Sequence, residues 1–108
     1  YKRQGEASDV VLQVGTLKKV SLRVKNKKKS TASLSWKKVA GAKKYQIYRA
    51  TRKKGKYSKI ATTKKLTYKN TLLSKKKTYY YKVRAYYVKA GKNIYGSYSN
   101  AKSIKITK

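Results

Sequence analysis

The chain has 108 residues, which suits one small domain, and its 32 Lys and Arg residues against 2 Asp and Glu give a formal net charge of +30. The absence of His and Cys removes the usual zinc ligands, the thiol nucleophile and the usual general base. Because both acids, Glu6 and Asp9, lie near the N-terminus, the rest of the chain cannot form a carboxylate pair or a calcium loop. We therefore expect no enzyme activity, no cofactor and no bound metal.

The residue types nevertheless predict a folded domain rather than a disordered basic tail. Such tails are poor in aromatic and β-branched residues, whereas this chain has 12 Tyr, one Trp and many Val, Ile and Thr in alternating patterns. Lysine interrupts every apolar run, so we expect no membrane insertion. The opening stretch YKRQGEASDVV lacks the apolar middle section of a signal peptide.

The first 16 residues stand apart from the rest of the pattern. Val10, Leu12 and Val14 alternate, so residues 1–16 are interpreted as a linker, as the last strand of a preceding module or as an added edge strand. Residues 17–108 are then predicted to be the domain proper.

Within the domain, period-two alternation recurs and helical periodicity does not. Clusters of Lys, Gly, Asn and Ser separate the alternating runs and are typical of turns. About seven short strands at this spacing predict an all-β antiparallel sandwich. In chain order, the predicted strands are residues 20–25, 31–36, 44–50, 57–62, 66–71, 78–88 and 101–107.

Alternation also predicts which side chains face the core, because successive residues of a strand point to opposite faces of the sheet. In residues 78–88 one face carries Tyr79, Tyr81, Val83 and Ala85, and the other carries tyrosines and cations. The same reasoning applies to the other strands. The predicted core residues are Leu34, Trp36, Tyr45, Ile47, Leu73, Tyr79, Tyr81, Val83, Ala85, Ile104 and Ile106.

The ordered segments SLSW, KVAGAKKYQIYRA, YSKIATT, LTYKNTLLSKKKTYYYKVRAYY and YGSYSNAKSIKI resemble a fibronectin type III domain. The closest likeness is to the Lys-rich kind found in secreted and surface proteins of Gram-positive bacteria. The resemblance covers residues 20–108 and implies a seven-stranded antiparallel immunoglobulin-like sandwich. It implies a buried tryptophan at Trp36, and a tyrosine corner of Leu73 and Tyr79 in which the phenol bonds to upstream backbone.

Two departures limit what the resemblance implies. The family often has Pro and Gly in the loop before the corner tyrosine, where this chain has Lys75 and Lys76. Residues 89–95 carry no Arg-Gly-Asp, so integrin binding does not transfer. The resemblance still implies an extracellular module, secreted or on the cell surface, and we expect neighbouring modules of the same chain among its partners.

The outward residues of the third and sixth strands form the candidate binding face, if those two strands pair. Tyrosines there could stack on sugar rings or bases while cations hold phosphate. The alternative interpretation is that outward tyrosines are simply good strand residues that pair across strands. The candidate residues are Lys44, Tyr48, Tyr80, Lys82, Arg84 and Tyr86.

The lysines have two interpretations as well. Exposed lysine is often a solubilising feature, yet so one-sided a surface must also attract polyanions through counterion release. Lysine outnumbers arginine heavily, which argues against sequence-specific nucleic-acid recognition. Our leading hypothesis is a non-catalytic accessory or spacer module that adheres to an anionic cell-wall polymer, such as teichoic acid, or to another acidic glycan. The alternatives are a carbohydrate-binding module that uses Tyr48, Tyr80 and Tyr86, and non-specific nucleic-acid binding.

Overall fold

The computed structural model describes residues 17–108, which form eight β-strands in two antiparallel sheets. The all-β class predicted from alternation is confirmed, and the segment 1–16 lies outside the described residues. Across residues 17–108, no helix has the length and apolar character that a membrane crossing needs. The strands are β2 (Leu22–Lys28), β3 (Thr31–Trp36), β4 (Lys44–Ala50), β5 (Ser58–Thr63), β6 (Thr67–Asn70), β7 (Thr78–Lys89), β8 (Lys92–Tyr95) and β9 (Lys102–Lys105).

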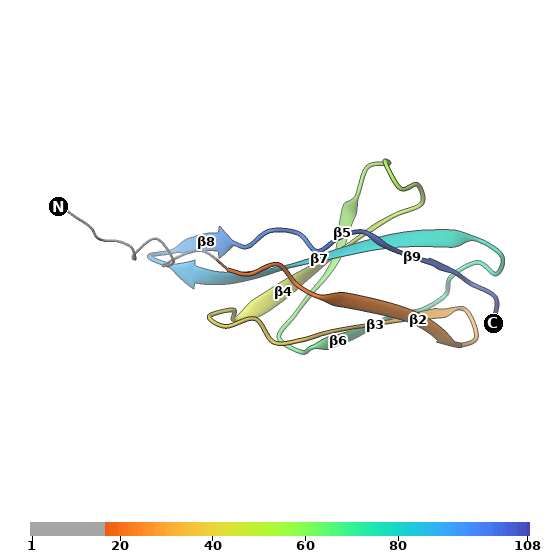
Figure 1. Cartoon of the computed structure of the whole chain (residues 1–108), viewed down its shortest axis with the longest axis horizontal. Coiled ribbons are helices and arrows are strands. Elements are labelled where there is room, and N and C mark those ends of the chain that lie inside the picture. The colour runs from red at the N-terminus through yellow and green to blue at the C-terminus, as the bar shows by residue number, and fades with distance from the viewer. Residues whose placement is uncertain (1–16) are drawn as a thin grey trace.

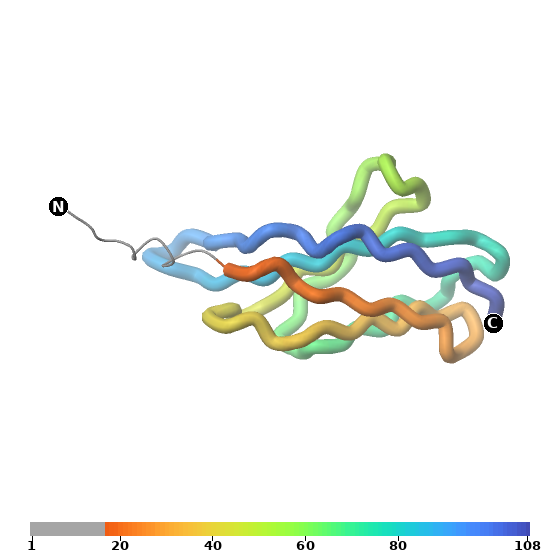
Figure 2. Tube along the Cα trace, in the orientation of Figure 1, coloured from red at the N-terminus to blue at the C-terminus, as the bar shows by residue number. Residues whose placement is uncertain are grey.

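The two sheets are stacked as a sandwich. One sheet has the order β2-β3-β6, and the other has the order β5-β4-β7, with both β8 and β9 pairing with β7. In Figure 1, β7 and β9 lie above β2 and β3, and the loop between β4 and β5 projects from the body. The trace in Figure 2 shows the same loop clearly, well away from the β2-β3 hairpin.

The strand count is eight where seven were expected, because the last edge strand is split. Strand β8 pairs with the end of β7 through a hairpin, and β9 pairs with its beginning. The residues at the hairpin tip, Ala90 and Gly91, both have positive φ, as a two-residue hairpin of this kind requires. The loop after β7 is therefore only two residues long, and β8, the strand that follows it, was not among the predicted strands.

The segment between β8 and β9 is irregular but still bonded to β7. The backbone N–H of Gly96 donates to the Ala85 carbonyl at 2.8 Å, and that of Ser99 donates to the Val83 carbonyl at 2.8 Å. The Val83 N–H in turn donates to the Ser99 hydroxyl at 3.0 Å, where a regular strand would offer a carbonyl. A buried side chain thus satisfies β7 where the edge strand departs from regular geometry.

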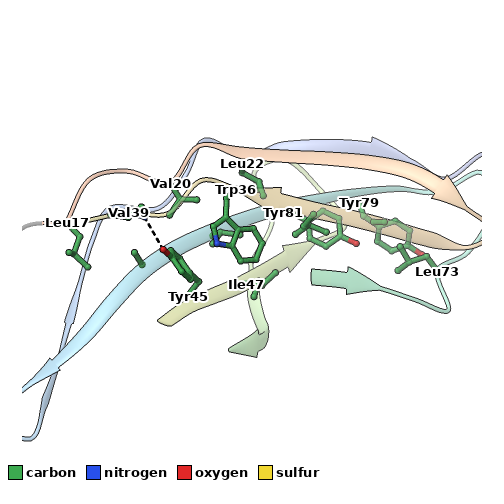
Figure 3. Packing of buried hydrophobic residues seen from close by; sticks show 14 of the residues in the cluster. Leu17, Val20, Leu22, Trp36, Val39, Tyr45, Ile47, Leu73, Tyr79 and Tyr81 are labelled. Atoms are coloured by element: carbon green, nitrogen blue, oxygen red, sulfur yellow. Dashed lines mark hydrogen bonds between the residues drawn. The ribbon is translucent and has the colours of Figure 1, made fainter. Parts of the chain in front are cut away.

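Apolar side chains from the two inner faces fill the space between the sheets. Figure 3 shows them as a row that runs from Leu17 and Val20, past Trp36, to Tyr79 and Leu73. The alternation predicted this core well, although Ile104 is only half-buried and packs against the cluster from its side. The residues predicted for the core that are buried are Leu34, Trp36, Tyr45, Ile47, Leu73, Tyr79, Tyr81, Val83, Ala85 and Ile106.

Candidate binding site

Strands β4 and β7 are neighbours, so the outward residues predicted from each do share one face. The antiparallel register places Lys44 opposite Tyr86 and Tyr48 opposite Lys82. On the same face, Gln46 lies opposite Arg84 and Ala50 lies opposite Tyr80. We call this outward surface of β4 and β7, together with the side chains that fold over it, the tyrosine face.

Tyr86 does not belong to the exposed part of this face. It is only 8% exposed, whereas the alternation predicted a solvent-facing side chain. The reason is β8, the strand that was not predicted, which places Tyr95 directly opposite Tyr86. The two rings pack with their centroids 5.6 Å apart, and this contact covers Tyr86.

Arg84 was expected to flank the tyrosines as a free cation, but its guanidinium is enclosed by them. Its Nε donates to Gln46 Oε1 at 2.9 Å, and its Nη2 donates to the Tyr48 hydroxyl at 3.0 Å. Its Cζ lies 3.8 Å from the Tyr95 ring centroid and 4.7 Å from that of Tyr98. Cation–π contacts of this kind contribute about 0.5–2 kcal/mol. Arg84 therefore organises the face, and its cation is less available to an outside anion.

Three tyrosines of the face were not predicted. Tyr98 lies edge-on to Tyr48 with centroids 5.2 Å apart, and Tyr57 has the ammonium of Lys82 4.4 Å from its ring centroid. Tyr95 and Tyr98 are the most exposed, at 40% and 39%. Both lie in the stretch YGSYSN, whose lack of alternation hid the fact that it runs along β7. Only the register between the strands shows that these two tyrosines lie on the tyrosine face, and no pattern in the sequence indicates it.

The tyrosine hydroxyls differ in their environments. The hydrogen bond from Asn93 lowers the pKa of Tyr95 below its ordinary value. Burial raises the pKa of Tyr98, and its hydrogen bond with Tyr48 acts in the same direction. Burial, followed by the neighbouring Tyr80 hydroxyl, raises the pKa of Tyr57. The face can stack on a ligand and exchange hydrogen bonds with it, but it has no carboxylate or imidazole with which to move protons at neutral pH.

No protein-family model and no curated protein sequence matches the chain. The sandwich superposes on a solved structure named FN3tt mut with a TM-score of 0.69, at 25% identity, over 85% of this chain and 98% of that one. The chain has the fibronectin type III fold.

Two further solved structures share this fibronectin type III fold. A Fn3-like protein from Clostridium thermocellum is 27% identical with a TM-score of 0.61, over 82% of this chain and 90% of that one. The sixth fibronectin type III domain of human fibronectin type III domain containing protein 3 is 16% identical with a TM-score of 0.68, over 83% and 85% of the two chains. At that identity the human domain supports the fold alone.

The tyrosine corner of the fibronectin type III fold is present. Leu73 and Tyr79 are buried, and the backbone N–H of Ser74 donates to the Tyr79 hydroxyl at 2.9 Å. A second phenol makes a similar contact, because the Val39 N–H donates to the Tyr45 hydroxyl at 3.0 Å. In the loop before the corner, Lys76 has a φ of 72°, a conformation that glycine adopts without strain.

Proposed function

We propose that this fibronectin type III domain is a non-catalytic accessory module of a secreted or surface protein of a Gram-positive bacterium. In this proposal it adheres electrostatically to an anionic polymer of the cell wall, of which teichoic acid is the type we favour. The fold supports a module of this kind, and the similarity to a Fn3-like protein of Clostridium thermocellum supports a bacterial setting.

The observation that carries the proposal is the complete imbalance of charge. Every Asp and Glu precedes residue 10, so the lysines and arginines of residues 17–108 have no side-chain carboxylate within this domain to pair with. Unpaired surface cations attract polyanions, and the binding gains free energy from the counterions that are released. Solubility alone would not require the removal of every acid.

The kind of cation favours adhesion over sequence readout. Lysine is a compact point charge, whereas arginine provides the planar fork that recognises bases and phosphates in a fixed geometry. Two of the few arginines are engaged internally: Arg84 bonds to Gln46, and Arg49 bonds to Asn70. Non-specific nucleic-acid binding follows from the same charge, but it would be a consequence of this chemistry in vitro rather than the role of an exported module.

The arrangement of the chain supports a role as a spacer. In Figure 2 the described trace begins toward one end of the long axis, and the C-terminus lies at the other end. A module with this geometry can be placed in line between neighbours, and its surface lysines then lie along the wall.

The test is a salt titration of wall binding. The purified domain is sedimented with Gram-positive cell walls at several sodium chloride concentrations, and the bound fraction is measured. We expect tight binding at low salt and a linear fall of log affinity with log salt concentration. Binding that does not change with salt would contradict an electrostatic origin.

A neutral glycan is the second candidate ligand, because Tyr95 and Tyr98, whose rings both contact Arg84, are substantially exposed. Aromatic rings of this kind can stack on sugars. Binding through them would resist salt and would be lost in the double variant Tyr95→Ala and Tyr98→Ala. The electrostatic proposal expects that variant to bind walls about as well as the unmodified domain does.

A further inference from the structure

The outward face of the β2-β3-β6 sheet, on the side opposite the tyrosine face, has a groove over its central strand. The register places Ser35 between residues of β2 and β6 in one row, and Ser33 between residues of the same strands in the next row. Because serine is short and its neighbours are mostly long, β3 forms the floor of a hollow of about 350 Å³. We call it the β3 groove, and the residues that define it are Arg23, Lys25, Ser33, Ser35, Thr67 and Lys69.

The groove continues beyond this hollow in two directions. A smaller hollow shares Arg23 and Ser35 with it and extends to Lys37. Another shares Thr67 and Lys69 with it and extends to Lys65. An open groove that continues past both margins suits an extended chain better than a compact ligand, which would need an enclosed pocket.

The cations along the groove differ from those of the tyrosine face in being exposed. Arg23, Lys25 and Lys69 are all solvent-exposed, whereas Arg84 is half-buried among aromatic rings. Residues 17–108 contain no carboxylate side chain that could compete for them. The groove therefore offers donors and positive charge to an outside anion at little cost in broken internal contacts.

The spacing of these cations suits a polyanion that lies along β3. Residues two apart on a strand, such as Arg23 and Lys25, are separated by roughly 6.7 Å, and strands two apart in a sheet by roughly 10 Å. A chain over β3 would therefore have cations of β2 on one side and Lys69 of β6 on the other. The hydroxyls of Ser33 and Ser35 would lie beneath it as donors.

We propose that the β3 groove is the site that binds the wall polymer, and that its ligand is a linear phosphodiester polymer without bases. This inference rests on the proposed function. Phosphate oxygens accept hydrogen bonds from hydroxyl groups as well as from Lys and Arg, and all three donor types converge here. The domain then binds the polymer at a defined site, and the rest of its charge adds only a diffuse attraction.

The absence of a stacking platform favours a polymer without bases over nucleic acid. Proteins that bind single strands place exposed aromatic rings along the groove, and base stacking supplies much of the affinity. The two aromatic residues at the margins of this groove are Tyr68 and Trp36. Trp36 is buried, and Tyr68 is half-buried with its ring packed against the core, so neither ring is free to stack on a base.

The test compares two variants that lose the same charge. One carries Arg23→Gln, Lys25→Gln and Lys69→Gln in the groove. The control carries Lys53→Gln, Lys54→Gln and Lys56→Gln in the exposed loop between β4 and β5, which projects from the other sheet. Circular dichroism and thermal melting serve as the controls that both variants fold. Binding of soluble poly(glycerol phosphate) is then titrated at several salt concentrations.

The slope of log affinity against log salt concentration changes by about 0.7 for each phosphate contact that is lost. For three lost contacts we therefore expect the groove variant to bind on the order of 50-fold more weakly at about 0.15 M salt. The control should weaken only slightly. A third variant with unchanged charge, Ser33→Ala and Ser35→Ala, should bind about five-fold more weakly through the lost hydroxyl donors.

Three other results would contradict the proposed site, the proposed ligand or the proposed function. Equal weakening of the two charge variants would mean diffuse adhesion, which removes the β3 groove as the site but leaves the proposed function intact. If single-stranded DNA or polyglutamate of equal charge binds as tightly through the groove, the assignment of a phosphodiester polymer without bases is wrong. If the unmodified domain binds no polyanion at physiological salt, the proposed function itself fails.

Discussion

The side-chain amide of Asn70 connects the two sheets in the interior of the sandwich. The Oδ1 atom of Asn70, on β6, accepts hydrogen bonds from Arg49 Nη1 at 2.9 Å and from the Tyr81 hydroxyl at 2.6 Å. Tyr81 is fully buried, and burial raises the pKa of its hydroxyl well above the ordinary value. The hydroxyl therefore stays protonated and needs an acceptor.

Replacing this amide should destabilise the domain. In Asn70→Ala, the buried hydroxyl of Tyr81 and the inward guanidinium of Arg49 lose their shared acceptor, which costs about 1–3 kcal/mol of unfolding free energy. The control is Asn93→Ala, which removes an exposed hydrogen bond to Tyr95 and should change stability by less than about 0.5 kcal/mol. Urea denaturation measures the unfolding free energy of both variants. If Asn70→Ala lowers it as little as the control does, the contacts of Asn70 contribute little to stability.

Contacts of this kind could not be predicted from the sequence. Asn70 and Arg49 are 21 positions apart, and Ser99 and Val83 are 16 apart. Alternation places a side chain on one face of its strand, but the partner of a polar group depends on the register between strands and on how the sheets stack. Arg49 shows the limit well, because it follows Tyr45 and Ile47 on the inward face of β4 yet carries a charge.

Among the elements, the central strands were predicted more reliably than the edge strand β8. The strong alternation of TASLSW, KYQIYRA and residues 78–88 corresponds closely to β3, β4 and β7. The stretch KNIYGSYSN has too few apolar residues in alternation, so β8 was missed, and with it the burial of Tyr86. The β3 groove could not be predicted either. Ser33 and Ser35 alone indicate only a solvent-facing side of the strand, and the groove depends on which residues lie beside them on β2 and β6.

The loop before β7 offers a test of backbone strain. Lys76 has a φ of 72°, and a residue with a Cβ in this left-handed conformation is strained by roughly 1–2 kcal/mol. We therefore expect Lys76→Gly to raise the unfolding free energy by about 1 kcal/mol, part of the relief being offset by the greater entropy of glycine in the unfolded chain.

The matched control is Lys75→Gly, which removes the same charge at a neighbouring position that does not have a positive φ. It should leave stability unchanged or lower it slightly. If both variants stabilise equally, the gain comes from the lost positive charge rather than from the backbone at Lys76.

At the scale of the whole molecule, the net charge of +30 must oppose folding, because compaction brings like charges together. Salt shortens the screening length from about 30 Å at 0.01 M to about 8 Å at 0.15 M, so repulsion weakens over that range. We expect the melting temperature to rise by on the order of 5 °C, which corresponds to roughly 1 kcal/mol for a domain of this size. Differential scanning calorimetry measures this rise, and a flat response would mean that the charges are too dispersed to matter.

In the proposed function, the exposed cations hold the domain to an acidic wall polymer. The most direct test of this claim is to measure the fraction of domain that sediments with intact cell walls and with walls stripped of teichoic acid, side by side at about 0.15 M salt. We predict substantial binding to intact walls and little to stripped walls. Equal binding to both kinds of wall would contradict the claim and would direct attention to a neutral glycan and the tyrosine face.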